Sequence, residues 1–410
     1  MMIIRNIIGY FKFPKASLWI FGLMLLLILS RFAMLNVQNW NSGYISNGMP
    51  GVKLAIDSER YISAAENMSK GVALQGREYQ FAGYIGLLAI IKTLNLSLNW
   101  VVVVQLFVAL AAGMALFDSV RVITENRWAA LMASGLYLCN PFLVCWHQYV
   151  MTESLYTSLV ILVSWALLRL LNKPKPLFYF AAAVFVVFAL LIRPNGWILL
   201  PVAAIAMLYS LRLSRRVFGL LSSVVVLMFF SAMGLVNVFN KSVMITSPVA
   251  NLQRGLTVWG HPELSLTMPQ EPAFDTSRMA GAVRYVAKHP LHSARLGAVR
   301  AGYSLIHIRP YHTVNYKWHL LLWIVPAYLL AIAGLIHFRR KPQLIVVSAV
   351  IAAHLLVVAV SYAEHDSRFD TYILPVFYLL AGLGIAALSA RICRAMGRNC
   401  GNDMVFWRKI

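Results

Sequence analysis

Long apolar runs dominate the pattern of hydrophobic and polar positions along the chain. Each run approaches the roughly 20 residues that an α-helix needs to cross a bilayer, and polar or basic residues bound it. The runs lie at residues 18–36, 98–117, 128–148, 155–171, 177–192, 195–211, 217–238, 318–338, 343–361 and 371–390. The pattern therefore predicts an all-α polytopic membrane protein, a bundle of about ten transmembrane helices.

A further apolar stretch, at residues 79–91, is short for a span. Only 13 residues there, between Glu78 and Lys92, are uncharged. Such a length suits a helix that lies in the membrane interface or re-enters the bilayer. At the N-terminus, basic residues precede the first run and no small-residue cleavage site follows it, so we expect an uncleaved anchor.

Composition excludes an ordinary soluble globular protein. Hydrophobic residues make up 60% of the chain and charged residues 12%, with a mean hydropathy of +0.70, whereas soluble domains carry about 25% charged residues. The net charge of +22 would suit a nucleic-acid-binding protein, but most Lys and Arg residues form short clusters between apolar runs. We therefore expect the lipid bilayer, and no nucleic acid, as a partner.

The basic clusters also predict the orientation. With the N-terminus inside and ten spans, most clusters lie on the inner side, and the short outer loops hold only Arg193 and Arg368. This arrangement follows the positive-inside rule. A rival topology with eleven spans and an outer N-terminus leaves Arg5, Lys12 and Lys15 outside. We therefore expect both termini in the cytoplasm.

Two of the outer loops are long, at about residues 36–97 and 239–317. They divide the chain into an N-terminal transmembrane half at 1–238, an outer helical loop at 239–317, and C-terminal transmembrane helices with a cytoplasmic tail at 318–410. Long loops cross the membrane largely regardless of their charge, so they do not disturb the predicted topology.

The second long loop is expected to be a small helical cap. Its sequence predicts one helix with Asp275 as N-cap and Pro290 as the stop, and another from about 292 to 306. Basic residues outnumber acidic ones in this loop. An anionic ligand is one reason for such an excess.

The few acidic residues are concentrated in the outer segments. The chain has 14 Asp and Glu residues. The predicted topology leaves only three of them inside, namely Asp118, Glu125 and Asp403. Acid–base chemistry is therefore expected at the outer face, in the N-terminal transmembrane half and its first outer loop.

Asp57 and Glu153 are the two candidate catalytic carboxylates. Both lie near helix ends, where they would face one cavity if the first outer loop folds over the bundle. Ordinary alternatives exist for both: Asp57 as a solvated loop acid, and Glu153 as a first-turn acid in a span that Thr152 or Ser154 caps. The polar stretch 364–370 either forms a hairpin or lines the same cavity.

Several short motifs follow one another in a familiar order. They are Asp57-Ser-Glu-Arg-Tyr, Ala82-Gly-Tyr, Arg127-Trp-Ala-Ala-Leu, Asn140-Pro-Phe, Thr152-Glu153, Ile192-Arg-Pro-Asn-Gly and Arg368-Phe-Asp-Thr-Tyr. In order and topology they resemble the GT-C glycosyltransferases, which include the aminoarabinose transferases of lipid A and the protein O-mannosyltransferases. The likeness is strongest over about 57–201 and returns at 366–380. It implies a GT-C-like bundle with interfacial helices in the first outer loop and a small helical periplasmic cap.

The resemblance also implies residue roles. Asp57 matches the general base, Glu153 the second acidic position, and Arg60 a basic residue close to the donor phosphate. A base would take the proton of an acceptor hydroxyl while guanidinium groups hold the leaving lipid phosphate. A single displacement of this kind inverts the anomeric centre. The implied enzyme is an inverting glycosyltransferase with a polyprenyl-phosphate sugar donor and an envelope lipid or glycan acceptor.

The sequence departs from the family at one place. Some relatives carry Lys-Pro before the Ala-Gly-Tyr step, where this chain has Tyr79-Gln80. Arg77 or Lys92 would replace that lysine, and the sequence does not choose between them. The candidates for binding substrate or donor phosphate are Arg60, Tyr61, Arg77, Tyr79, Lys92, Arg193, Arg254, His261, Arg295 and Arg368.

Each basic candidate has an ordinary interpretation as well. Arg193 would snorkel from a span end to the headgroups. Arg284, Arg295 and Arg300 would solvate the outward faces of loop helices. Trp259, beside His261, suits sugar stacking but equally suits loop packing. The histidines show no ligand spacing, so no metal and no other cofactor is expected.

Two other functions fit a membrane protein of this kind. One is a transporter or flippase of a lipid-linked sugar, and the other is a glycan polymerase or ligase. Transporters carry ionisable residues at the middle of several spans, and here the spans are almost free of charge apart from Arg31. The resemblance favours a bacterial inner membrane, with the active site at the periplasmic face.

Overall fold

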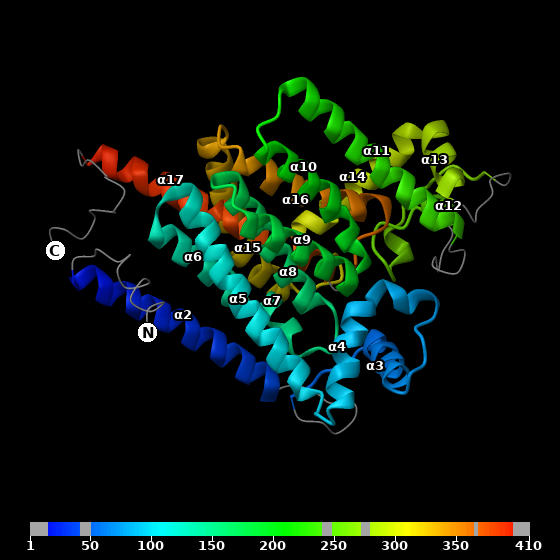
Figure 1. The fold of residues 1–410 in the computed structure, drawn as a ribbon, viewed down its shortest axis with the longest axis horizontal. Helices are drawn as coiled ribbons and strands as arrows, with labels where there is room; N and C mark the ends of the chain where they lie inside the picture. Colours follow the sequence, from blue (N-terminus) through cyan, green and yellow to red (C-terminus); the bar gives the residue numbers. More distant parts are fainter. Residues whose placement is uncertain (1–14, 42–50, 240–247, 272–278, 365–367, 397–410) are drawn as a thin grey trace.

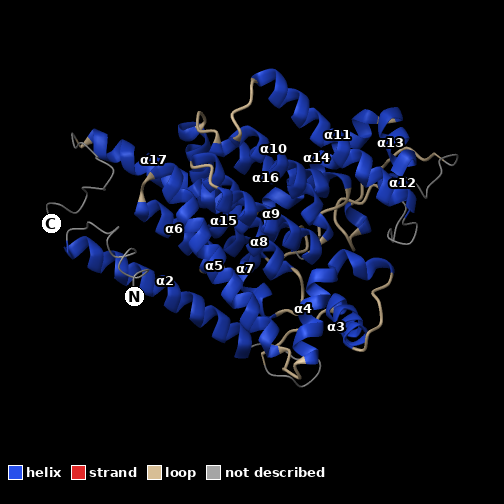
Figure 2. Cartoon of the chain, in the orientation of Figure 1, coloured by secondary structure: helices blue, strands red, loops and turns tan. Residues whose placement is uncertain are grey.

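The fold is that of a computed structural model, which describes residues 15–41, 51–239, 248–271, 279–364 and 368–396. Over these residues the chain is helical (Figure 2). Isolated bridges, Lys53 with Tyr149 and Val258 with Ala363, are the extended pairings in this part of the chain. The prediction of an all-α protein is confirmed.

Six of the described helices are long and apolar enough to cross a membrane. Each has at least 18 residues, which at about 1.5 Å per residue gives a length of about 27 Å or more. Figure 1 shows how they are arranged. They are α2 (Lys15–Asn41), α5 (Asn99–Thr124), α8 (Glu153–Asn172), α15 (Val314–Phe338), α16 (Gln343–Val360) and α17 (Leu374–Ala395). All six coincide with predicted spans.

The predicted span 128–148 is not one straight helix. It consists of α6 (Arg127–Leu138) followed by α7 (Pro141–Val144) and η2 (Cys145–Gln148), with a bend of 50° between the two parts. Asn140 ends the first part because its backbone is extended and its side chain accepts a hydrogen bond from the Phe142 amide. A proline in the next position disfavours a helical conformation at Asn140. Counted as one span, this pair raises the total to seven.

The predicted spans 177–192 and 195–211 are shorter helices than the six above. They are α9 (Pro176–Ile192), then η3 (Pro194–Ile198) with α10 (Leu199–Ser210). Arg193 separates them with an extended backbone, as expected for a residue that precedes proline. The next helix, α11 (Arg215–Phe239), covers the predicted run 217–238. In the described part of the chain, six or seven spans are therefore supported by length and composition, and the number ten remains a prediction.

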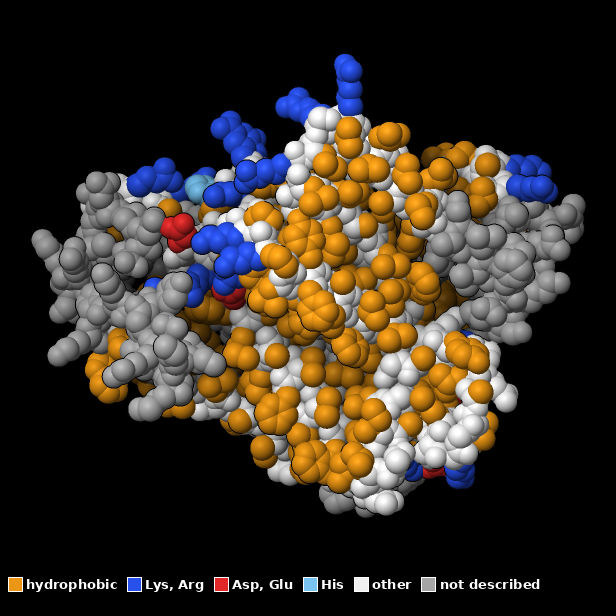
Figure 3. All heavy atoms as spheres, in the orientation of Figure 1, with side chains coloured by type: hydrophobic (Ala, Val, Ile, Leu, Met, Phe, Trp, Pro, Cys, Tyr) orange, Lys and Arg blue, Asp and Glu red, His pale blue; other side chains and the backbone are white. Residues whose placement is uncertain are grey.

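Helix α8 lies at the centre of the bundle. It packs against α5, α9, α10 and α16, and 83% of its apolar window is buried. By contrast, α2 lies at one edge in Figure 1 with only 17% of its window buried. Apolar side chains cover much of the surface in Figure 3. Such a surface is expected where lipid is the solvent.

Small residues allow α15 and α17 to pack closely. A β-carbon added to Gly334 would lie 2.3 Å from the Leu380 carbonyl oxygen, and one added to Gly384 would lie 1.9 Å from the Leu330 carbonyl oxygen. Close approach over small residues is a common mode of helix packing in membranes. This packing holds α17 against α15. The start of α17 directly follows the segment that contains Arg368.

The described residues of the predicted first outer loop are largely helical. They form α3 (Ile56–Ser69), η1 (Gly76–Phe81) and α4 (Ala82–Thr93). With 12 residues, α4 is too short to cross a bilayer, as predicted for 79–91. It packs against α3, α5 and α9, so the loop folds onto the bundle.

The described residues of the second long loop are largely helical and form a small unit, which we call the cap. It contains α12 (Pro248–Gln253), η4 (Pro262–Leu264), α13 (Met279–Lys288) and α14 (Pro290–Ile306). A separate apolar cluster, which includes Val249, Tyr285 and Leu296, holds α12, α13 and α14 together. Pro290 does not only end a helix but begins α14, where a missing amide proton costs nothing. The predicted N-cap Asp275 lies outside the described residues.

The connection from α14 to α15 buries an imidazole. His307 is 4% exposed, and its Nε2 lies 3.3 Å from the Tyr328 hydroxyl. Burial, and then the charge of Arg309, lower the pKa of His307 to about 3. In the unfolded chain histidine binds a proton near pH 6.5. Between these two values the unfolded state binds more protons, so stability falls as the pH falls.

We expect His307→Asn to reduce this loss of stability in acid. His307 has φ of 59°, and Asn tolerates such a left-handed conformation. The thermal midpoint of the wild type should fall more than that of the variant between about pH 7.5 and pH 5. His292→Asn, at an exposed position of α14, is the control. If the thermal midpoint of the wild type and that of His307→Asn fall equally on acidification, His307 is not the cause of the loss of stability.

Candidate active site

Asp57 lies in the first turn of α3. The helix begins where the Ser58 hydroxyl accepts a hydrogen bond from the Ala55 amide at 2.9 Å, and the helix dipole favours a carboxylate in this turn. One Asp57 oxygen lies 3.2 Å from Arg60 and the other lies 3.2 Å from Arg368. The Asp57 side chain is 35% exposed. It is therefore held between two guanidinium groups and still reachable from outside.

Glu153 is the first residue of α8 and is completely buried. Nη1 of Arg193 donates hydrogen bonds to Glu153 Oε1 at 2.8 Å and to Thr152 Oγ1 at 2.6 Å. Nη1 of Arg368 lies 3.9 Å from the same Glu153 oxygen, so Arg368 stands between Glu153 and Asp57. Among the described residues, Glu153 Oε2 is buried without a hydrogen-bond partner.

A third carboxylate, Glu364, joins these groups through Arg368. Its Oε1 lies 3.5 Å from Arg368 Nη2. The cap holds the backbone here, because Arg309 donates to the Glu364 carbonyl at 3.1 Å and the Trp259 amide donates to the Ala363 carbonyl at 2.8 Å. The cap thus fixes one side of the site.

Aromatic rings surround the charged groups. Tyr61 is buried and packs on Phe81 and Tyr84, with ring centroids 5.1 Å and 5.4 Å away. Arg193 lies over the Tyr372 ring, 5.0 Å from its centroid. Burial raises the pKa of Tyr61 to about 12, so this phenol stays protonated. Rings in these positions exclude water and attract the guanidinium groups.

Arg77 adds a fourth guanidinium group. It is half-buried, and burial followed by the nearby charge of Arg60 lowers the pKa of Arg77, which Asp57 opposes. A guanidinium group whose pKa is lowered by burial and by a neighbouring cation is stabilised by an anion placed beside it. The site thus contains four guanidinium groups and three carboxylates. These seven side chains together carry one net positive charge (4 − 3). We call the set the Asp57 cluster: Asp57, Arg60, Tyr61, Arg77, Glu153, Arg193, Glu364, Arg368 and Tyr372.

The Asp57 cluster brings together many of the residues predicted from sequence. Both candidate carboxylates lie in it. Among the predicted binding residues, it contains Arg60, Tyr61, Arg77, Arg193 and Arg368. Arg193 does not reach toward headgroups, because its side chain is only 10% exposed and is paired with Glu153.

The other predicted binding residues lie outside the cluster. Tyr79 is 62% exposed, and Lys92 forms an ion pair with Glu66. Of the two residues that the GT-C resemblance offers in place of the Lys-Pro lysine, Arg77 is therefore the one beside Asp57. Arg254 and Arg295 are exposed on the cap. His261 pairs with Glu263 and stacks on Tyr311, so it belongs to the cap surface.

The ordinary interpretation of Glu153 as a first-turn acid is confirmed, because it lies in the first turn of α8. The expected side-chain cap of this helix and the expected exposure of Arg300 are wrong. Thr152 does not cap α8 with its side chain, and the Ser154 hydroxyl pairs with His147 Nδ1 at 2.7 Å. Arg300 does not solvate an outer helix face, because it is fully buried. Its guanidinium donates to the carbonyls of Leu256 and Ala359 at 2.8 Å and 3.2 Å, which ties α14 to α16.

The list of binding candidates drawn from sequence omitted several neighbours of Asp57 and Glu153. These are Thr152, Glu364 and Tyr372, together with Tyr84. A signal existed for two of them: Glu364 and Tyr372 flank Arg368 in the polar stretch before the last span. Nothing in the sequence pattern distinguishes Tyr84 from any other aromatic residue in an apolar helix.

Comparisons with models of known protein families, with functionally characterised proteins and with solved structures gave no match for this chain. The resemblance to the GT-C glycosyltransferases therefore remains one of short motifs and topology. Among the described residues, no three His, Cys, Asp or Glu side chains are grouped as metal ligands. The prediction of no metal remains a prediction.

Proposed function

We propose that this protein is an inverting glycosyltransferase that moves a sugar from a polyprenyl-phosphate donor to a hydroxyl group of an envelope lipid or glycan. The proposed location is the periplasmic face of a bacterial inner membrane, with both termini in the cytoplasm. One observation carries the proposal: a reachable carboxylate, Asp57, lies between two guanidinium groups and beside the buried Glu153–Arg193 pair. This arrangement supplies a base next to an excess of positive charge.

In the proposed reaction Asp57 takes the proton of the acceptor hydroxyl. The hydroxyl oxygen forms a bond to the anomeric carbon as the bond from that carbon to the phosphate oxygen breaks. The bonding electrons leave with the phosphate, so the products are a glycosylated acceptor of inverted configuration and the polyprenyl phosphate. Protonated Asp57 then returns its proton to water. A carboxylate in hydrogen-bond reach is suited to this role.

Arg60 and Arg77 are assigned to the donor phosphate. Negative charge grows on the leaving phosphate in the transition state, and guanidinium groups stabilise it through charge-assisted hydrogen bonds. The lowered pKa of Arg77, caused by burial and then by Arg60, supports an anion at this place. The polyprenyl chain of such a donor would remain in the bilayer.

Glu153 is assigned a positioning role. It is 0% exposed, so a substrate does not reach it. It binds Arg193 and lies near Arg368, and Arg368 in turn binds Asp57. Glu153 therefore acts on the base through Arg368.

The proposal is tested by donor consumption in membranes that contain the overproduced protein. A panel of radiolabelled polyprenyl-phosphate sugars is supplied, and lipids and glycans are separated after incubation. We expect loss of one donor and appearance of its label on a hydroxyl acceptor. Membranes of the same host without the protein are the control. If every donor stays intact while its label changes leaflet, the flippase alternative replaces the proposal.

We expect Arg368→Gln to lower transfer by about 10²-fold or more, since one planar guanidinium holds three carboxylates in place. Its nitrogens lie 3.2 Å from Asp57, 3.9 Å from Glu153 and 3.5 Å from Glu364. Arg368→Lys should recover only part of the loss, because a lysine is a point charge without that planar fork. The measurement is the initial rate of transfer per amount of protein.

Arg295→Gln is the matched control for Arg368→Gln. Arg295 is an exposed cap residue, and its loss should change the rate by less than about twofold, as for most surface substitutions. Full activity in Arg368→Gln would show that Asp57 needs no support from Arg368, and the proposed geometry would be wrong.

A further inference from the structure

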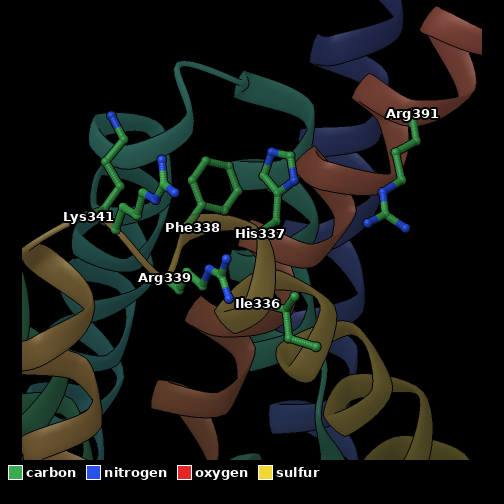
Figure 4. A pocket seen from close by; sticks show the side chains of 7 residues that line it. Ile336, His337, Phe338, Arg339, Lys341 and Arg391 are labelled. Carbon is green, nitrogen blue, oxygen red and sulfur yellow. The ribbon is translucent and has the colours of Figure 1, made fainter.

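A basic hollow lies at the end of α15, where the chain turns into α16. Residues 336–341 and Arg391 of α17 line a cavity of about 740 Å³, which we call the basic hollow. Figure 4 shows Arg391 on its own helix, across from Arg339 and Lys341 of the turn. Helices from two places in the sequence therefore build it.

The basic hollow and the Asp57 cluster lie at opposite ends of the same helices. Helix α17 begins next to Tyr372 of the cluster and reaches Arg391 after 17 residues (391 − 374), a distance of about 26 Å. Helix α16 runs from this turn to Val360, close to Glu364, over 18 residues, or about 27 Å. That length is close to the roughly 30 Å hydrocarbon core of a bilayer. If the Asp57 cluster faces one leaflet, the hollow faces the other.

The chemistry of the hollow suits a phosphate group. Arg339, Arg340, Lys341 and Arg391 provide four permanent positive charges, and the described residues that line the hollow include no carboxylate. Guanidinium groups bind phosphate through two parallel hydrogen bonds. The positive-inside rule accounts for basic residues at this end of the helices. It does not account for their meeting around one hollow from two segments.

The surroundings of the hollow suit a lipid. Ile336 in its wall is 59% exposed, and on α17 Leu388 and Ile392, which flank Arg391 in sequence, are 50% and 46% exposed. These apolar side chains lie on helices that are long and apolar enough to cross a membrane. A lipid would place its phosphate among the cations and its acyl chains along these apolar residues.

We propose that the basic hollow binds the phosphate headgroup of an anionic membrane lipid, in the leaflet opposite the Asp57 cluster. This proposal does not depend on the proposed transferase activity. It assigns a second ligand site to the chain. The cations of this site would bind the lipid phosphate, and the apolar residues beside them would contact the acyl chains.

The test is lipid binding by the purified full-length protein in a zwitterionic detergent. Phosphatidylglycerol is titrated in, and binding is followed by native mass spectrometry and by the rise in thermal midpoint that a ligand of the folded state produces. Arg339→Gln, Arg340→Gln and Arg391→Gln are combined in one variant. We expect its affinity for phosphatidylglycerol to fall by about tenfold or more, because each charge contributes to the attraction. The single Arg391→Gln variant should show a smaller loss in the same direction and tests the proposal if the combined variant does not fold.

Three controls separate the hollow from general charge attraction. Arg212→Gln, Arg215→Gln and Arg216→Gln together remove the same charge from exposed positions in the turn before α11 and at its start. This variant should bind as the wild type does. Phosphatidylcholine tests the need for net negative charge, and inorganic phosphate tests the need for a lipid. The proposal is overturned if both combined variants lose affinity equally, if neither does, or if inorganic phosphate produces the same shift as the lipid.

Discussion

Replacing Asp57 by Asn is expected to lower the proposed sugar transfer by about 10²- to 10⁴-fold, the usual contribution of a general base. The substitution keeps the shape of the side chain and its reach toward Arg60 and Arg368, which lie 3.2 Å from the Asp57 oxygens. It removes the negative charge, and with it both the ability to accept the hydroxyl proton and the ion pairs with Arg60 and Arg368. The measurement is the initial rate of transfer in membranes that contain equal amounts of each protein.

Glu59→Gln is the matched control for Asp57→Asn. Glu59 lies in the same first turn of α3, and its side chain is exposed. The same change of charge there should leave the rate within about twofold of the wild type. Wild-type activity in Asp57→Asn would refute the assignment of the base.

Removing one partner of the buried Glu153–Arg193 pair is expected to lower the free energy of unfolding by about 3–5 kcal/mol. Glu153 is 0% exposed and the Arg193 side chain is 10% exposed, so either substitution leaves a charge that water does not reach. We expect Glu153→Gln and Arg193→Gln each to lower the thermal midpoint of the protein in detergent. The double variant should lose less than the sum of the single losses, because it leaves neither charge alone.

The control for this pair is a comparison with an exposed pair. Lys92 and Glu66 have side chains that are 34% and 46% exposed, and Glu66→Gln should cost no more than about 1 kcal/mol. Additive losses in the Glu153/Arg193 double variant would mean that the two residues do not support each other. Unchanged stability combined with lost transfer would assign Glu153 to the chemistry instead.

Hydropathy predicted the long helices well because the bilayer requires each spanning segment to satisfy its own backbone. It did not predict where an apolar run bends. Pro141 follows the break in the run 128–148, whereas Pro326 lies within the continuous helix α15. The difference is that Asn140 supplies a side-chain cap for the next helix. A hydropathy average does not contain this information.

The sequence identified individual residues of the site more readily than the contacts between them. Asp57, Glu153 and Arg368 all lie in polar motifs within an apolar chain, which made them visible. Their contacts join segments far apart, since Arg368 and Asp57 are separated by 311 positions. The role of Arg193 as the partner of Glu153 depends on where α8 and α9 end relative to each other. Periodicity does not give that relation.

Arg77 and Lys92 illustrate the same limit. The sequence offers both as replacements for the lysine found in some GT-C glycosyltransferases, because both flank the Ala82-Gly-Tyr step. The fold separates them: Lys92 pairs with Glu66 at the end of α4, while Arg77 lies close enough to Arg60 for their charges to interact. Only the packing of α4 on α3 decides between two residues with the same charge.

The most direct test of the central claim uses purified protein in liposomes and a donor that carries one label on its sugar and another on its phosphate. The ratio of the two labels in the extracted polyprenyl lipid is measured over time, with an acceptor present. We predict that the sugar label leaves the lipid while the phosphate label stays, which means that the bond between them is broken. A constant ratio of the two labels, with every donor in the panel, would contradict an enzymatic role for the Asp57 cluster.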